Sequence, residues 1–323
     1  MKRRQFLLLA TAAAVTPIWT ARAAAYPTRP IKLIVPFAPG GSTDVIARVI
    51  SEPLTRSLGQ PVVVENKGGA GGLIGTMDLV RSAPDGYTLL MATMSVTGSY
   101  PAINPKSPYD PITDIVPIIN IAASPSVLAV HPGFPARNYK DFIAEIKKNP
   151  GQYTYASPGV GGIVHLLMEY FNGLVGASIR HVPFKGAGPA LTAVVARQVD
   201  IVYDTPPSVL PFIRNGQLVP IVLSAPERWK DLPDVPTFRE VGLDRMTRMP
   251  NFGLLGPKGL PREIVSTVNG ATRQALEDPS LRQRIEDSGA VVVGSTPEEY
   301  GADIKSLFAE LKTVVAERKL TME

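Results

Sequence analysis

Short apolar runs alternate with longer amphipathic segments along most of the chain. Residues 31–35 (IKLIV) form a compact β-branched run, and residues 43–57 then place apolar side chains at helical spacing. This alternation is typical of α/β units, in which helices connect the strands of a mainly parallel sheet. The expected strands span residues 31–35, 62–65, 87–92, 127–130, 153–156, 179–182 and 200–204, and the expected helices span residues 43–57, 73–81, 139–148, 163–174 and 189–197.

The C-terminal part of the chain predicts a discontinuous first lobe. Pro261 suits the first turn of a helix, and Thr296 to Glu299 form a capping box with proline at the first helical position. A helical tail without its own strands has to pack on an existing sheet. The proline-rich segments 99–117 and 225–250 are expected to be irregular. We therefore expect one lobe from residues 26–125 plus 251–323 and a second lobe from residues 126–250.

The first 25 residues have the order of an export signal. A basic start precedes an apolar stretch from Phe6, and small residues follow at Ala21, Ala23 and Ala25, where a cleavage site of the A-x-A type would fall. The apolar stretch is short for a membrane span. The segment RRQFL (Arg3–Leu7) resembles a twin-arginine signal, but Sec signals also begin with basic pairs. We expect a periplasmic protein exported by the Sec or the Tat route.

Charge and composition exclude several classes of function. Four of the five excess positive charges come from the first 25 residues, and no later cluster of lysine and arginine predicts a nucleic-acid surface. The chain has no cysteine, and His131, His165 and His181 lack the spacing of metal ligands. No Gly-Lys-Ser/Thr loop for nucleotide phosphates is present. We expect no metal, no cofactor and no nucleic acid, and a monomer.

Glycine-rich corners follow four of the expected strands. They read APGG, GAGG, GVGG and KGAG, and they begin at Ala38, Gly69, Gly159 and Lys185. Ligands of open α/β sheets bind beyond the carboxyl ends of strands, and a helix start after glycine offers free N–H groups to an anion. Tight turns alone would also explain each corner. Two corners combine strand, proline, glycine and helix start, and we expect Gly40–Asp44 to face Ser157–Gly162 across a small carboxylate.

Single polar residues near these corners have two interpretations each. Asp44 either pairs with Arg48 on its helix or contacts the ligand. His165 either contacts the ligand or packs in its helix, and Lys185 is either a ligand contact or a surface cation. Asp204 ends its strand at the edge where sites gather, which favours function. Ser157 lacks the Gly-x-Ser-x-Gly elbow of a nucleophile, so a hydrolase acting through Ser157 and His165 is disfavoured and we expect no enzyme.

Six segments resemble the periplasmic solute-binding proteins of tripartite tricarboxylate transporters, the Bug family. They read YPTRPIKLIVPFAPGGSTDVIAR, VENKGGAGG, APDGYTLL, YASPGVGGIVH, VPFKGAGPALT and LPDVPTFREVGL, in the order of the family. The resemblance implies a two-lobed, type II Venus-flytrap fold. It also implies capture of a small organic carboxylate, such as a di- or tricarboxylate, an amino acid or an aromatic acid, for delivery to membrane permease subunits. The alternative is a binding subunit that reports to a membrane sensor kinase.

The resemblance also gives the candidate ligand-binding residues. Three positions depart from the family, because Gly162, Phe184 and Asn251 stand where relatives usually have Ser or Thr, Tyr, and often Trp. The ligand is therefore not transferable from a relative. The expected ligand-binding residues are Phe37, Ala38, Gly40, Gly41, Ser42, Thr43, Asp44, Thr93, Ser157, Gly159, Gly161, Gly162, His165, Phe184, Lys185, Gly186 and Asp204.

Overall fold

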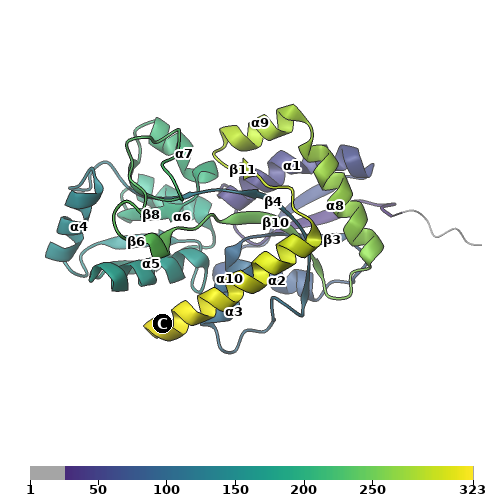
Figure 1. The fold of residues 1–323 in the computed structure, drawn as a ribbon, viewed down its shortest axis with the longest axis horizontal. Helices are drawn as coiled ribbons and strands as arrows, with labels where there is room; N and C mark the ends of the chain where they lie inside the picture. Colours follow the sequence, from purple (N-terminus) through teal and green to yellow (C-terminus); the bar gives the residue numbers. More distant parts are fainter. Residues whose placement is uncertain (1–25, 323) are drawn as a thin grey trace, which may run out of the picture.

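The computed structural model describes residues 26–322, and this part of the chain forms two sheets flanked by helices (Figure 1). The expected export signal lies outside the described residues. The first sheet has the strand order β11-β4-β10-β3-β1-β2, and the second has the order β7-β6-β8-β5-β9. The strands are β1 (Ile31–Val35), β2 (Val62–Asn66), β3 (Thr88–Ala92), β4 (Ile115–Ala123), β5 (Ser126–Val130), β6 (Thr154–Ser157), β7 (Arg180–Pro183), β8 (Ile201–Asp204), β9 (Val219–Ser224), β10 (Asn251–Pro257) and β11 (Val291–Val292).

Each sheet is covered by its own helices. The first sheet contacts α1 (Ser42–Leu58), α2 (Leu73–Val80), α8 (Arg262–Leu276), α9 (Pro279–Asp287) and α10 (Pro297–Arg318). The second sheet contacts α4 (Tyr139–Lys148), α5 (Ile163–Val175), α6 (Ala187–Val195) and α7 (Pro206–Arg214). Short helical segments connect the larger elements: η1 (Ala70–Gly72), η2 (Ser95–Ser99), α3 (Tyr100–Ile103) and η3 (Asp244–Met246).

The α/β fold class is confirmed, but the sheets are mixed instead of mainly parallel. β1 is parallel to β2 and β3, whereas β10 is antiparallel to β3 and β4. In the second sheet β6 is parallel to β7 and β8, whereas β5 is antiparallel to β8 and β9. The sequence pattern did not predict β4, β9, β10 or β11. The tail therefore does bring strands to the first sheet, contrary to the expectation that it is helical only.

The apolar periodicity of the strands and helices explains the hydrophobic core between each sheet and its helices. In β1, Ile31 and Leu33 are fully buried, and they pack in one cluster with Ile46 and Ile50 from the inner face of α1. Around the second sheet, aromatic residues of β6 and α5 fill the corresponding core. The chain crosses from the first sheet to the second between β4 and β5 and returns between β9 and β10. The residue boundaries expected for the two lobes stay predictions.

Helix α10 runs along both parts of the molecule (Figure 1). The expected capping box is present, because the Thr296 hydroxyl accepts from Glu299 N–H while the Glu299 carboxylate accepts from Thr296 N–H. Its first half packs against the first sheet through Tyr300 and Ile304. Its second half joins the core cluster of the second sheet, as Leu311 shows by its complete burial there. α10 therefore contributes to the cores of both lobes.

Candidate functional site

A cavity of about 60 Å³ lies where elements of both sheets meet. The first sheet and its connections contribute residues of β10, of the β3–η2 junction and of the start of α1, and the second contributes the ends of β6 and β8 and the starts of α5 and α6. The lining residues are Phe37, Gly41, Ser42, Thr43, Thr93, Met94, Ser95, Ser126, Pro158, Ile163, Val164, Leu167, Ala187, Tyr203, Asp204, Thr205, Pro250, Asn251 and Phe252. The wall is largely apolar, with polar groups concentrated at helix starts.

Several helices begin at this cavity. In α1 the first helical hydrogen bond runs from Val45 N–H to Gly41, so the N–H groups of Ser42 and Thr43 precede it. α5 and α6 begin at Ile163 and Ala187, which also line the cavity, and the Ile163 N–H already donates to Ser95 Oγ at 3.0 Å. Free N–H groups and the partial positive charge of helix starts attract anions. Among residues 26–322, no lysine, arginine or histidine lines this cavity, so these helix starts are its sources of positive potential.

Three buried polar atoms at the cavity have no hydrogen-bond partner. They are the hydroxyls of Tyr203 and Thr205 and the side-chain oxygen of Asn251, and each of these residues is less than 9% exposed. The two hydroxyls lie near other polar groups, Ser126 and Ser224 in one case and Asp204 in the other, without the geometry of a hydrogen bond. Buried polar groups in proteins are normally paired. These atoms are therefore available to a bound molecule.

Asp204 is the one carboxylate among the described residues that line the cavity. Its two oxygens accept hydrogen bonds from the Thr205 N–H at 2.8 Å and from the Ser208 hydroxyl at 2.6 Å. The residue keeps some exposed surface, but protein atoms surround its carboxylate. Burial raises the pKa of Asp204 to about 6, and the hydrogen bonds from Ser208 and Thr205 offset only part of that rise.

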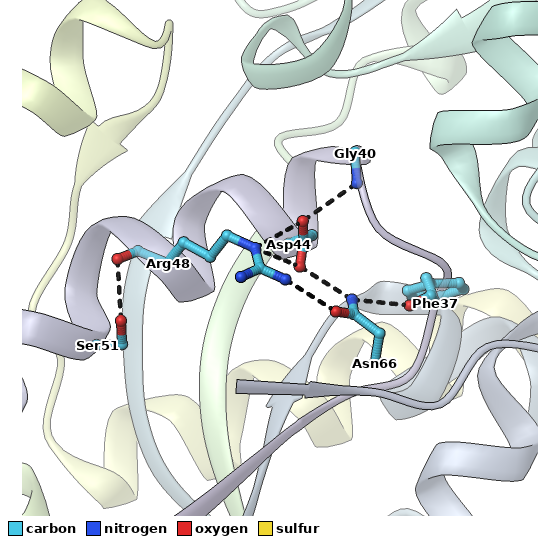
Figure 2. A network of polar contacts seen from close by, with 6 residues as sticks. All are labelled: Phe37, Gly40, Asp44, Arg48, Ser51 and Asn66. Carbon is cyan, nitrogen blue, oxygen red and sulfur yellow. Dashed lines mark hydrogen bonds and ion pairs between the residues drawn. The ribbon is translucent and has the colours of Figure 1, made fainter. Parts of the chain in front are cut away.

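Asp44 does not line the cavity and instead belongs to a network of hydrogen bonds (Figure 2). Its carboxylate accepts from Gly40 N–H at 3.1 Å, from Arg48 Nε at 3.0 Å and from Asn66 Nδ2 at 2.9 Å. Burial alone would raise the pKa of Asp44, but these hydrogen bonds outweigh it and hold the pKa below its ordinary value. Of the two interpretations of Asp44, the geometry favours the ion pair with Arg48.

The four glycine-rich corners contact each other in two pairs. The APGG corner meets the KGAG corner, where Ala38 N–H donates to the Lys185 carbonyl at 3.0 Å and Gly40 lies against Gly188. The GAGG corner meets the GVGG corner, where a Cβ on Gly159 would lie 2.6 Å from the backbone nitrogen of Gly71. The prediction that Gly40–Asp44 faces Ser157–Gly162 across a bound carboxylate stays a prediction, since it concerns residues on either side of a ligand and not a direct contact. Glycine is required here because the backbones touch, as well as for turns.

Ser157 is hydrogen-bonded to His181, not to His165. The Ser157 hydroxyl lies 2.5 Å from His181 Nε2, while His165 stacks on the far side of the His181 ring at 4.3 Å and accepts from Gly161 N–H. Burial lowers the pKa of His181 to about 4 and also lowers the pKa of His165. Ser157 is completely buried and does not line the cavity. The Ser157–His165 pair that a hydrolase would need is therefore not formed, and the buried Ser157 hydroxyl cannot be reached by a substrate in the cavity.

The structure divides the predicted ligand-binding residues into two groups. Those that line the cavity are Phe37, Gly41, Ser42, Thr43, Thr93 and Asp204. Those that do not line it are Ala38, Gly40, Asp44, Ser157, Gly159, Gly161, Gly162, His165, Phe184, Lys185 and Gly186. Sequence reasoning missed Ser95 and Thr205, although both follow a strand end within three residues, which is a signal for such sites. It noted Asn251 only as a departure from the family.

Two features are absent from the part of the chain that the structure describes. No helix within residues 26–322 is long and apolar enough to cross a membrane. In the same part of the chain, no group of three or more histidine, aspartate or glutamate side chains is arranged to hold a metal ion.

A cavity lined by residues of two lobes suits a protein that binds a small molecule. The family model described as the tripartite tricarboxylate transporter family receptor matches residues 46–320. The chain belongs to this family, which is also named after the Bug proteins, and it is a binding protein and not an enzyme. Protein BugT of Bordetella pertussis is 37% identical over 294 residues, which cover 91% of this chain and 89% of BugT.

Solved structures of related proteins share the fold over nearly the whole described chain. A structure described as a periplasmic transporter is 44% identical, with a TM-score of 0.90, and the match covers 93% of this chain and all of that one. MatC of Rhodopseudomonas palustris, solved with bound malate, is 33% identical with a TM-score of 0.87 over 90% of this chain and 100% of MatC. A second R. palustris protein, solved with adipate, is 29% identical with a TM-score of 0.87 over 92% of this chain and 99% of its own.

Proposed function

We propose that the protein captures a small organic carboxylate in the cavity between its lobes. The observation that carries this proposal is the convergence of the starts of α1, α5 and α6 on a buried cavity that also presents unpartnered polar atoms. Helix starts contribute roughly 0.3 to 2 kcal/mol each to anion binding, whereas micromolar affinity needs about 8 kcal/mol. Hydrogen bonds from Thr205 and Tyr203 and contact with Phe37 and Phe252 would supply the remainder.

The site of action in this proposal is the periplasm, and the receiver of the carboxylate is a membrane permease. Support comes from the family description, which names a transporter receptor, and from a structural relative described as a periplasmic transporter. Malate and adipate, the molecules bound in two structural relatives, are both small carboxylates. The order of basic, apolar and small residues in the first 25 positions agrees with export. Delivery to a permease is favoured over reporting to a sensor kinase because the family is named for transport.

Isothermal titration calorimetry against a panel of small mono- and dicarboxylates tests the proposed function. Ala187 lines the cavity at the start of α6, so Ala187→Leu fills space that the ligand needs. We expect at least one acid to bind the natural protein at micromolar concentration and to lose at least about tenfold in affinity to Ala187→Leu. Thr192→Leu is the matched control, because Thr192 is exposed on the same helix away from the cavity. Equal affinity in Ala187→Leu would remove this cavity from the function.

A further inference from the structure

The charge of the cavity limits the charge of its ligand. Asp204 and the Asn251 side-chain oxygen are both hydrogen-bond acceptors at the cavity, and the Asn251 oxygen is buried without a partner. An acceptor attracts a donor, such as a hydroxyl, and repels a second carboxylate. A ligand with one carboxylate uses the helix starts, but a second carboxylate would meet these acceptors.

Two arginines near these elements form ion pairs with carboxylates outside the cavity. Arg48 pairs with Asp44 in the network of Figure 2. Arg248, beside Tyr203, pairs with Glu310 of α10 at 2.8 Å, and its own side chain is 8% exposed. Neither guanidinium is among the groups that line the cavity. A second negative charge would therefore enter the cavity without a cation to balance it, which is costly in a buried site.

The size of the cavity favours a short ligand. One buried water needs roughly 10–15 Å³, so about 60 Å³ corresponds to only a few such positions. The lining also includes Met94, Val164 and Leu167, which suit a methyl or short alkyl group better than a charged one. Space, charge and wall chemistry agree on a short ligand with a single anionic end.

We propose that this protein selects a short monocarboxylate, such as a 2-hydroxy acid of about four carbons, over dicarboxylates of the same length. The inference rests on the proposed function and concerns the ligand class at the same cavity. The single carboxylate meets the starts of α1 and α5, a hydroxyl donates to Asp204 or Asn251, and the alkyl end lies against the apolar wall. Malate and adipate, seen in relatives, are then poor ligands for this chain.

Calorimetric titration of 2-hydroxybutyrate and of malate, at pH 8, tests the inference. The two acids share their carbon skeleton and hydroxyl and differ in a methyl group against a second carboxylate, and hexanoate against adipate gives a longer pair. We expect 2-hydroxybutyrate to bind at least about tenfold more tightly than malate. Equal or tighter binding of malate overturns the inference but leaves the proposed function standing. A failure of every acid to bind overturns both.

Substitution at Asp204 tests the cause of the selection. Asp204→Asn removes the charge and keeps the shape, so the ratio of malate affinity to 2-hydroxybutyrate affinity should rise at least about fivefold, whatever the variant does to each affinity alone. Asp231→Asn is the control, since Asp231 pairs with Arg214 at the far end of α7 and should alter neither affinity. An unchanged ratio in folded Asp204→Asn overturns the role of Asp204.

Asn251→Asp gives a second test should Asp204→Asn fail to fold. It adds a negative charge at the unpartnered oxygen. We expect 2-hydroxybutyrate to lose at least about tenfold in affinity, because even one carboxylate then faces two acids. Unchanged affinity in this variant would show that the ligand does not reach Asn251 and would overturn the inference. Thermal unfolding of each variant confirms that it is folded before titration.

Discussion

Asp44 and Asp204 both lie near helix starts, but their pKa values shift in opposite directions because their hydrogen-bond partners differ. Asp44 accepts three kinds of donor, from Arg48, Asn66 and Gly40, and its pKa falls. Asp204 accepts from Thr205 and Ser208 only, has no cation beside it, and its pKa rises to about 6. The spacing of Asp44 and Arg48 along the sequence left both interpretations open, because Asn66 enters the network from β2. Such a long-range partner is not readable from local sequence.

Removal of the Asp44 side chain should destabilise the protein without affecting ligand binding. Asp44→Ala removes the carboxylate that accepts from Arg48, Asn66 and Gly40 in Figure 2, so we expect a loss of about 1–3 kcal/mol in the free energy of unfolding. Urea denaturation measures this loss. Glu52→Ala, which removes an exposed ion pair with Arg56 on the same helix, should cost less than about 0.5 kcal/mol. Ligand affinity that falls with Asp44→Ala would contradict the structural role.

Asp204 and His181 titrate with opposite effects on stability over the same pH range. The raised pKa of Asp204, about 6, means that the folded state binds a proton before the unfolded state does, so acidification from pH 6 to 4 stabilises the fold. The lowered pKa of His181, about 4, means that the unfolded state binds its proton first, so acidification from pH 6.5 to 4 destabilises the fold. The two contributions offset each other in the natural protein.

Asp204→Asn should therefore reveal an acid sensitivity that the natural protein hides. Without ligand, we expect the free energy of unfolding of Asp204→Asn to fall by about 1–2 kcal/mol more than that of the natural protein between pH 7 and pH 5. Urea denaturation at both pH values gives the two differences. All other groups titrate alike in both proteins, so the comparison isolates Asp204. Parallel pH profiles would show that Asp204 titrates near its ordinary value.

At the scale of elements, the sequence predicted the strands that carry strong apolar runs and missed those that depend on their neighbours. The expected strand at residues 31–35 matches β1, and the expected helix at 139–148 matches α4. β10 reads NFGLLGP, with two glycines and a terminal proline, so its intrinsic strand propensity is poor. It forms because β3 and β4 supply hydrogen bonds on both sides. Two residues that line the candidate cavity, Asn251 and Phe252, belong to this strand.

The corners at strand ends were correctly located, but what they touch depends on the placement of one lobe against the other. We expect Gly188→Ala to destabilise the contact between these two corners and to weaken ligand binding at least about tenfold. Its Cβ would lie 2.2 Å from the Pro39 carbonyl oxygen of the opposite corner, while its own helical backbone accepts alanine readily. Gly173→Ala on α5 is the control, because a Cβ there meets no neighbouring atom within 4 Å. Calorimetry and thermal unfolding together measure both effects, and an unchanged affinity would mean that these corners need not touch in the bound state.

At the scale of the whole molecule, α10 connects the two lobes because it packs into the hydrophobic core beside each sheet. Its first half packs on the first sheet, whereas Leu307, Leu311 and Val314 pack with residues of the second. Ion pairs reinforce the second half, since Glu310 and Glu317 meet Arg248 and Arg245 of the return connection. The capping box predicted the start of this helix from sequence. The local sequence did not predict that the second half of the helix packs against the second lobe. Separation of the lobes would expose these apolar contacts, so they favour the arrangement described here.

The packing of α10 predicts that a residue outside the cavity controls ligand affinity. Leu311→Ala removes a completely buried side chain from the cluster shared with the second lobe and should cost about 2–5 kcal/mol in stability. Part of that cost should fall only on the state in which both lobes pack against α10 as described here. If the ligand binds this state, affinity for the best carboxylate should also drop at least about tenfold. Leu276→Ala removes an equally apolar side chain from the core of the first sheet and should destabilise without changing affinity. Urea denaturation and calorimetry on both variants separate the two effects. Equal affinities in the two variants would show that α10 keeps its contacts with the second lobe whether or not the lobes are closed.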